Sequence, residues 1–186
     1  TDNDIQGISI DYLKLISERT GIKFKFIKET RPFESALLGI KKLQSPDLIQ
    51  CMEPTKERES YMTFTQNYLT SPRVIFTRDD VDFISGIEDL EGKIIATVRG
   101  TVLQEMLALQ YSNIKLLLFD SDEKSIEAVA SGEAFAYIGN LNLATFLIKE
   151  HGLANLTVAA PCPFHAHSFS FRIRRDWPDS RRIFFI

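Results

Sequence analysis

A charged stretch in the first third of the chain carries side chains that suit ligand binding. In CMEPTKERE, residues 51–59, Arg58 lies among several glutamates that include Glu53. A planar guanidinium can hold a carboxylate through two parallel hydrogen bonds, which the point charge of lysine cannot reproduce. Arg58 is therefore either a carboxylate-binding group or a surface residue on a short helix. A glutamate within reach would pair with Arg58 and partly neutralise it, so Glu53 bears directly on which ligand can bind.

A second candidate site lies at Arg99-Gly100-Thr101. Thr101 and Gln104 have the spacing of a capping box, which predicts a helix that begins after Thr101. The free backbone N–H groups and the dipole of such a helix start attract anions, and Arg99 beside them would add a positive charge. The alternative is that Thr101 only caps the helix and that Arg99 is solvated.

The segment PCPFHAHSF could hold a metal ion, because Cys162, His165 and His167 lie close together in the sequence. In an extended segment His165 and His167 share a face, but the set is one ligand short of a structural zinc site, and a plain polar edge is the alternative. Catalytic motifs of the Gly-x-Ser-x-Gly, phosphate-loop and His-Glu-x-x-His types are missing from the sequence. Only Glu53, Asp120 and the histidines are candidate acids or bases, so we expect neither a metal site nor an enzyme.

These residues follow elements that alternate along the chain. The patterns predict helices at 11–20, 33–43, 101–112, 121–131 and 141–152, a helical turn at 85–92 and a helix start near 176. They predict strands at 22–27, 47–51, 72–78, 93–98, 114–119, 134–139, 156–160 and 168–174. Such alternation is typical of an α/β fold with mostly parallel sheets. Ligands of open α/β sheets bind at the carboxyl ends of the strands, where the candidate residues fall.

Bulk composition excludes several classes of protein. Of the 186 residues 44% are hydrophobic and 25% charged, which is ordinary for a globular protein, and the net charge of −3 argues against a nucleic-acid partner. The longest apolar run falls short of the roughly 20 residues that cross a bilayer, and TDNDIQG has no signal-peptide pattern. We expect a soluble protein, or a soluble domain of a longer one. Cys51 and Cys162 could pair, but their spacing does not require it.

Four segments in order resemble the family 3 extracellular solute-binding proteins, which have the type II periplasmic-binding, or Venus flytrap, fold. The segments are GISIDYLKLISERTGIKFKFI, PTKERESYMTFTQNYLTSP, EDLEGKIIATVRGTVLQEML and SGEAFAYIGNLNLATFLI, and a DWP near the end also resembles the family. The resemblance covers nearly the whole chain. Within the family, the ER…FT..Y and AYIGNL patterns are most similar to the sensor domains of hybrid histidine kinases.

The resemblance implies two lobes, each built on a mostly parallel sheet with flanking helices. Lobe 1 would comprise residues 1–71 and 170–186, and lobe 2 residues 72–169. The two hinge crossings would be formed by Thr70, Ser71 and Pro72 and by His167, Ser168 and Phe169. By comparison with the family pattern, we expect lobe 1 to be incomplete at both ends, because the first strand would precede Thr1 and the last helices would follow Ile186.

Six residues fall at the ligand contacts that the resemblance implies: Cys51, Glu53, Arg58, Arg99, Thr101 and Asn140. Arg58 matches the family's carboxylate-binding arginine. Glu53 stands where a serine or threonine hydroxyl usually assists it, and Asn140 stands where an aspartate usually binds the ligand's ammonium group. A carboxylate beside Arg58 and a neutral amide at Asn140 would both disfavour an ordinary α-amino acid in the usual pose. We therefore expect a ligand that is not a standard amino acid held in the standard way, or no ligand at all.

The implied function is that of an extracytoplasmic sensor domain. It would close on a small polar ligand, such as an amino-acid-like or other carboxylate, and signal to a membrane-anchored histidine kinase or similar module in the same chain. No cofactor is implied. A free periplasmic binding protein of an ABC importer is one alternative, and an enzyme on the same fold, or the binding lobe of a lytic transglycosylase, is another.

Overall fold

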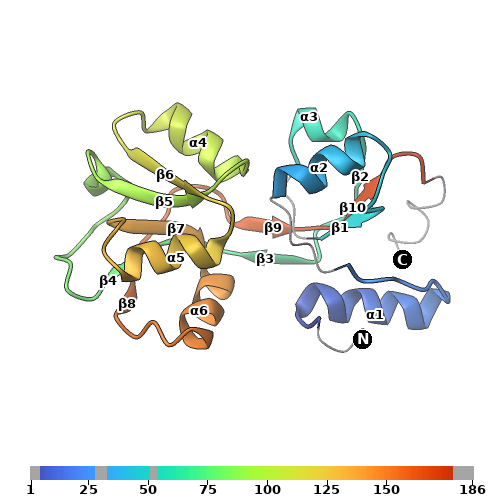
Figure 1. Ribbon diagram of the computed structural model, residues 1–186, viewed down its shortest axis with the longest axis horizontal. Coiled ribbons are helices and arrows are strands. Elements are labelled where there is room, and N and C mark those ends of the chain that lie inside the picture. The colour runs from blue at the N-terminus through green and yellow to red at the C-terminus, as the bar shows by residue number, and fades with distance from the viewer. Residues whose placement is uncertain (1–4, 28–32, 51–53, 178–186) are drawn as a thin grey trace. The chain divides into compact units, whose positions relative to one another are not determined.

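The chain forms two compact units in this computed structural model, which describes residues 5–27, 33–50 and 54–177 (Figure 1). Unit 1 comprises Thr1–Leu69 and Ser168–Ile186, and unit 2 comprises Thr70–His167. The sequence predicted lobe boundaries after residues 71 and 169. Each of these is two residues further along the chain than the corresponding unit boundary in the structure.

The elements of unit 1 are α1 (Ile8–Thr20), α2 (Phe33–Lys41), β1 (Leu48–Ile49), α3 (Lys56–Glu59), β2 (Met62–Phe64) and β10 (Arg172–Arg174). The elements of unit 2 are β4 (Arg73–Arg78), the 3-10 helix η2 (Ile87–Leu90), β5 (Ile94–Val98), α4 (Val102–Gln110), β6 (Lys115–Phe119), α5 (Asp122–Ala130), β7 (Ala136–Asn140), α6 (Leu141–Glu150) and β8 (Leu156–Pro161). The crossings contain β3 (Leu69–Ser71) and β9 (His167–Phe169), which pair in a two-stranded sheet. Both unit boundaries fall within these two strands.

Unit 2 is built on a five-stranded sheet in the order β6-β5-β7-β4-β8. Strand β5 pairs in parallel with β6 and β7, whereas β4 pairs antiparallel with both β7 and β8. Four strands therefore share one direction, as expected for strand–helix–strand units. Only β4, which the chain forms directly after its first crossing, runs against them.

Helices cover both faces of this sheet (Figure 1). On one face, Leu103 and Leu107 of α4 pack with Ile75, Ile95 and Ile138 of the strands. The opposite face is covered by α5 and α6. Its core comprises Val74, Phe76, Ala96, Ile126, Ala128, Val129, Ala134, Tyr137 and Ala144. Neighbouring residues of one strand enter different clusters, which is the period-2 alternation of a sheet buried on both sides.

The described sheet of unit 1 has the order β1-β10-β2, and both of its pairings are antiparallel. The expectation of a mostly parallel sheet is therefore wrong for these strands. The reason is that β10, formed after the second crossing, inserts between β1 and β2 and runs against them. Each unit thus contains one reversed strand, and in both units it follows a crossing.

The predicted strand at 22–27 is also wrong, because these residues belong to no strand. Their side chains nevertheless alternate in exposure: Ile22, Phe24 and Phe26 are partly buried, while the lysines between them are exposed. The sequence pattern thus indicated which side faces the protein but not whether a partner strand was present. Among the described residues, none of the helices has the length and apolar character needed to span a membrane.

Candidate ligand-binding residues

Arg58 lies in unit 1 on the four-residue helix α3 and is only 6% exposed. Thr55 caps this helix, and its Oγ1 accepts a hydrogen bond of 3.2 Å from the backbone N–H of Arg58. The arginine is therefore on a short helix, as one reading of the sequence expected, but it is buried. A buried guanidinium is tolerated only when its donors are bonded or paired. Its charge also acts on Tyr61, whose pKa is raised by burial while Arg58 partly opposes the shift.

Arg99, Gly100 and Thr101 lie at the start of α4 in unit 2. Thr101 Oγ1 accepts from the Gln104 N–H at 3.2 Å, and Gln104 Oε1 accepts from the Gly100 N–H at 2.7 Å. The first bond is the cap that the spacing predicted, whereas the return bond from the Gln104 side chain reaches Gly100, one residue before the cap, rather than Thr101 itself. Gly100 has φ 72°, a left-handed conformation that favours glycine. The Arg99 side chain is about half exposed, and its Nε lies 3.9 Å from Asp120 Oδ1, a weak surface ion pair.

Asn140 ends β7 and caps α6. Its Oδ1 accepts hydrogen bonds from the Leu143 N–H and from the hydroxyl of Ser71, each at 3.0 Å. The residue is 6% exposed, and its Nδ2 is buried without a hydrogen-bond partner within the described residues. A buried amide donor left unpaired costs about 1–3 kcal/mol, so this group is suited to an added acceptor. The bond from Ser71 joins the cap to one of the predicted hinge residues.

A polar pair with no local signal in the sequence joins the start of α5 to the same strand, β7. The hydroxyl of Tyr137, on β7, donates to Asp122 Oδ1 at 2.5 Å. Burial raises the pKa of the Asp122 carboxyl, although the Tyr137 hydrogen bond and the nearby His167 oppose the shift. Burial and the negative charge of Asp122 raise the pKa of Tyr137 well above its ordinary value. A Cβ at Gly139 would lie 2.0 Å from the Tyr137 hydroxyl, so glycine leaves the space that this ring occupies.

Two buried arginines were also missed. Arg73 opens β4, and its Nη1 donates to the carbonyl oxygen of His165 at 2.8 Å. Arg172 opens β10, is fully buried, lies over the Phe64 ring at 3.8 Å, and its Nη1 donates to the hydroxyl of Ser170. Each reversed strand thus begins with a buried guanidinium. The only sequence signal was an arginine at the start of each of two short strand-like runs, RVIF and RIR.

The remaining candidates from the sequence are Cys51, Glu53 and the proposed metal ligands Cys162, His165 and His167. Cys51 and Glu53 lie outside the described residues. Cys162 is a free, half-buried thiol whose pKa is raised by burial. The Cys162 sulfur and the ring nitrogens of His165 and His167 do not lie close enough together to hold a metal ion. The three residues are therefore near one another in the sequence but do not form a metal site.

Comparison with known proteins places this chain in a family of solute-binding proteins. The profile of the bacterial extracellular solute-binding proteins, family 3, matches residues 1–184. The virulence sensor protein BvgS of Bordetella pertussis is 28% identical over 162 residues, which are 86% of this chain and 13% of that protein. The ABC transporter arginine-binding protein 1 of Escherichia coli is 24% identical over 163 residues, 86% of this chain and 65% of that protein. The chain therefore spans a small part of the sensor relative.

The fold also has a close structural counterpart. The crystal structure of the Bordetella pertussis BvgS periplasmic VFT2 domain aligns with a TM-score of 0.82 at 24% identity, over 97% of this chain and 77% of that one. This likeness confirms the two-lobed α/β fold that the sequence predicted.

Proposed function

Because this chain belongs to family 3 of the bacterial extracellular solute-binding proteins, we propose that it is the ligand-sensing domain of a membrane-anchored receptor. It would lie on the periplasmic or extracellular side of the cytoplasmic membrane and bind a small polar solute. Similarity to a virulence sensor supports the receptor role. The output, through a histidine kinase or similar module elsewhere in the same protein, is part of the proposal.

The observation that carries the ligand-binding role is the buried Nδ2 of Asn140 at the start of α6, which has no hydrogen-bond partner among the residues that the structure describes. Its Oδ1 is already used twice, so the group offered to a ligand is a donor. An α-ammonium group is also a donor and would gain nothing from Nδ2. We infer that the ligand presents an acceptor here, such as a carbonyl, hydroxyl or carboxylate oxygen.

Arg58 in unit 1 would bind a carboxylate. Glu53, if it pairs with Arg58, would weaken that interaction for ordinary amino acids. Arg99 and Thr101 would add positive potential at the start of α4, with Arg99 contributing modestly because its side chain is half exposed. Cys51 completes the proposed set. The ligand class that fits is a carboxylate without an α-ammonium group, or with that group placed elsewhere.

A thermal-shift screen tests this ligand class. Matched pairs of compounds, each an amino acid and its 2-hydroxy analogue, should be screened against the unmodified chain and against Asn140→Asp. We expect the hydroxy acids to be preferred by the unmodified chain and the amino acids to gain in Asn140→Asp, because aspartate supplies the negative partner of an ammonium group. Arg58→Lys should weaken both. Tight, Arg58-dependent binding of common amino acids by the unmodified chain would overturn the assignment.

A second candidate function, a free binding protein of an ABC importer, is favoured by the similarity to an arginine-binding transport component. The sequence of the full-length gene distinguishes the receptor from the importer component. A membrane span and a kinase module encoded after Ile186 would support the receptor, and a stop codon within a few dozen residues would support the importer. In either case we propose that the domain itself has no catalytic activity, and metal-independent consumption of a bound solute would contradict this.

A further inference from the structure

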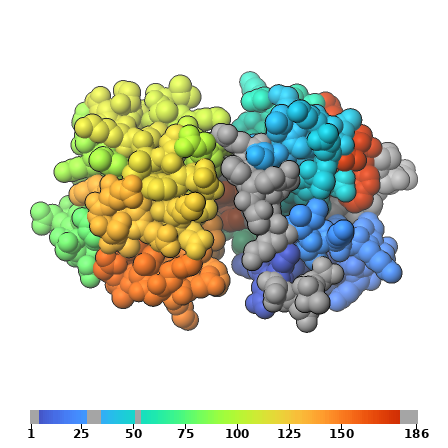
Figure 2. Space-filling model, in the orientation of Figure 1, coloured from blue at the N-terminus to red at the C-terminus, as the bar shows by residue number. Residues whose placement is uncertain are grey.

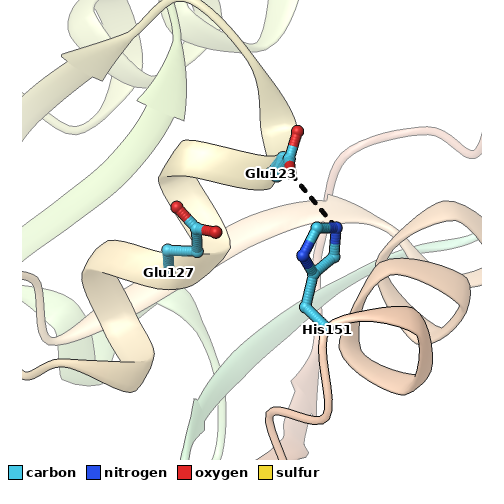
Figure 3. A group of neighbouring side chains, drawn as sticks. All are labelled: Glu123, Glu127 and His151. Carbon is cyan, nitrogen blue, oxygen red and sulfur yellow. Dashed lines mark ion pairs between the residues drawn. The ribbon is translucent and has the colours of Figure 1, made fainter.

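Three side chains able to bind a metal ion gather on the surface of unit 2, away from the residues discussed above. Glu123 and Glu127 lie on successive turns of α5, and His151 faces them from the end of α6 (Figure 3). The ligand atoms of the three residues all lie within 4.8 Å of one another. His151 Nε2 is 3.2 Å from Glu123 Oε1. Within the part of the chain that the structure describes, this is the only group of its kind.

The positions of these residues are fixed by two packed helices rather than by loops. Helix α5 begins at its Ser121 cap, and the i, i+4 spacing of the two glutamates places both on one face. Buried residues of α5 and α6 belong to one apolar cluster, so the helices are held side by side, and their surfaces adjoin in Figure 2. His151 is the C-cap of α6, and its backbone N–H donates to the Leu147 carbonyl at 2.9 Å. Sites on such elements are held more precisely than sites on loops.

The local charge favours a cation. Two carboxylates at i and i+4 on a helix repel each other. Glu123 has the imidazole beside it, but Glu127 makes no ion pair or side-chain hydrogen bond within the described residues. A doubly charged ion between the three side chains would offset this repulsion and satisfy both carboxylates.

We propose that Glu123, Glu127 and His151 bind a divalent transition-metal ion of the Zn²⁺ type, with water completing the coordination. Zinc bonds to imidazole nitrogen and carboxylate oxygen are about 2.0–2.2 Å long, which puts neighbouring ligand atoms of a tetrahedral site about 3.3–3.6 Å apart. The 3.2 Å between His151 and Glu123 already matches this spacing closely. Glu127, being exposed, can approach by rotating its side chain. The imidazole ligand favours Zn²⁺ over Ca²⁺ and Mg²⁺, which prefer all-oxygen sites.

The competing explanation is a surface ion pair between His151 and Glu123, which would contribute little to stability and need no metal. The two explanations differ in what Glu127 does, since it has no part in the ion pair but is a ligand in the proposed site. They also differ in whether the three residues bind an added ion together.

Isothermal titration of the chain with ZnCl₂ tests the proposal, after removal of any oligohistidine tag. We expect one saturable site. His151→Ala and Glu127→Gln should each weaken it at least as much as the roughly 10–100-fold that loss of an outer-shell partner costs. The matched control is His165→Ala, which removes another exposed histidine of unit 2 and should leave affinity unchanged. Circular dichroism of each variant establishes that it is folded, which is expected because all three side chains are exposed.

A second readout places the ion. In the NMR spectrum of the folded chain, Zn²⁺ should shift the imidazole signals of His151 and leave those of His165 unchanged. The proposal is overturned if no saturable binding occurs, if His151→Ala binds as tightly as the unmodified chain, or if His165→Ala alone abolishes binding, which would place the metal near Cys162 instead. Because none of these three residues is a proposed solute contact, the metal site and the solute-binding function succeed or fail separately.

Discussion

At the scale of single residues, burial distinguishes the candidates that the sequence presented alike. Arg58 and Arg99 both follow predicted strands, yet Arg58 is buried and Arg99 is half exposed. The residue type and the family resemblance could identify both as anion-binding candidates. Neither could predict the difference in exposure, because it depends on packing around a four-residue helix that has little periodicity of its own. The Tyr137–Asp122 pair could not be predicted either, since the two residues meet only when α5 packs against β7.

Asp122 should make stability depend on pH. Its pKa is raised in the folded chain from the ordinary value of 3.8, so the folded state holds the proton more tightly than the unfolded state. Stability should therefore fall as the pH rises from about 3.8 through the raised pKa. In Asp122→Asn the hydrogen bond from Tyr137 can persist, and this fall should disappear.

Denaturant unfolding of both proteins across that pH range measures the effect. Tyr137→Phe is the matched control, because it removes the hydrogen bond that holds the Asp122 pKa down and should steepen the fall. Parallel pH profiles for the unmodified chain and Asp122→Asn would show that burial of this carboxyl is unimportant.

At the scale of elements, local signals predicted helices better than strands. The caps of α4 and α5, Thr101 and Ser121, lie next to the residues they bond, so the sequence alone indicated both starts. Strand formation needs a partner, and no local pattern supplies one. Residues 22–27 alternate without joining a strand, and the predicted strand at 168–174 is divided into β9 and β10. The reversed directions of β4 and β10 were likewise invisible, because direction is set by where the chain re-enters each unit.

The Thr101 cap permits a test at this scale. Thr101→Ala should lower the free energy of unfolding by about 1 kcal/mol, because the Gln104 N–H loses its acceptor. Thr101→Ser keeps the hydroxyl and should be close to the unmodified chain. Thermal or denaturant unfolding measures both.

The same two variants also distinguish a capping role of Thr101 from a direct contact with the ligand, when stability and affinity are both measured. If Thr101→Ala loses stability but keeps its affinity for a solute found by the screen, Thr101 acts only as a cap. A stability unchanged in Thr101→Ala would contradict the capping role itself.

At the scale of the whole molecule, the chain passes between the two units only at β3 and β9. We propose that Thr70, Ser71 and Pro72 and His167, Ser168 and Phe169 act as hinges for closure on ligand, since two crossings permit rotation but resist other motions. Identical solution-scattering profiles with and without ligand would contradict closure.

Ser71 should link the ligand to the first crossing, because its buried hydroxyl bonds to Asn140 Oδ1. Ser71→Ala removes this bond and should weaken binding of a screened ligand by about 0.5–1.5 kcal/mol. Thr157→Ala, at an exposed position of β8 outside the proposed hinges and ligand contacts, is the control and should bind normally. Titration calorimetry of the three proteins measures the difference, and equal affinities for Ser71→Ala and the unmodified chain would exclude the link.

The insertion of β10 between β1 and β2 has a consequence for how the protein is synthesised. Unit 2 is one continuous stretch, Thr70–His167, so all its strands are available as soon as that stretch leaves the ribosome. In unit 1, β1 and β2 are made early, but their described sheet lacks its middle strand until Arg172–Arg174 is translated. Pairings between distant segments form slowly because a long loop must first close. The nascent chain should therefore complete unit 2 first and carry β1 and β2 without their middle strand until Arg172–Arg174 has been translated, which makes that interval the time of greatest exposure to aggregation.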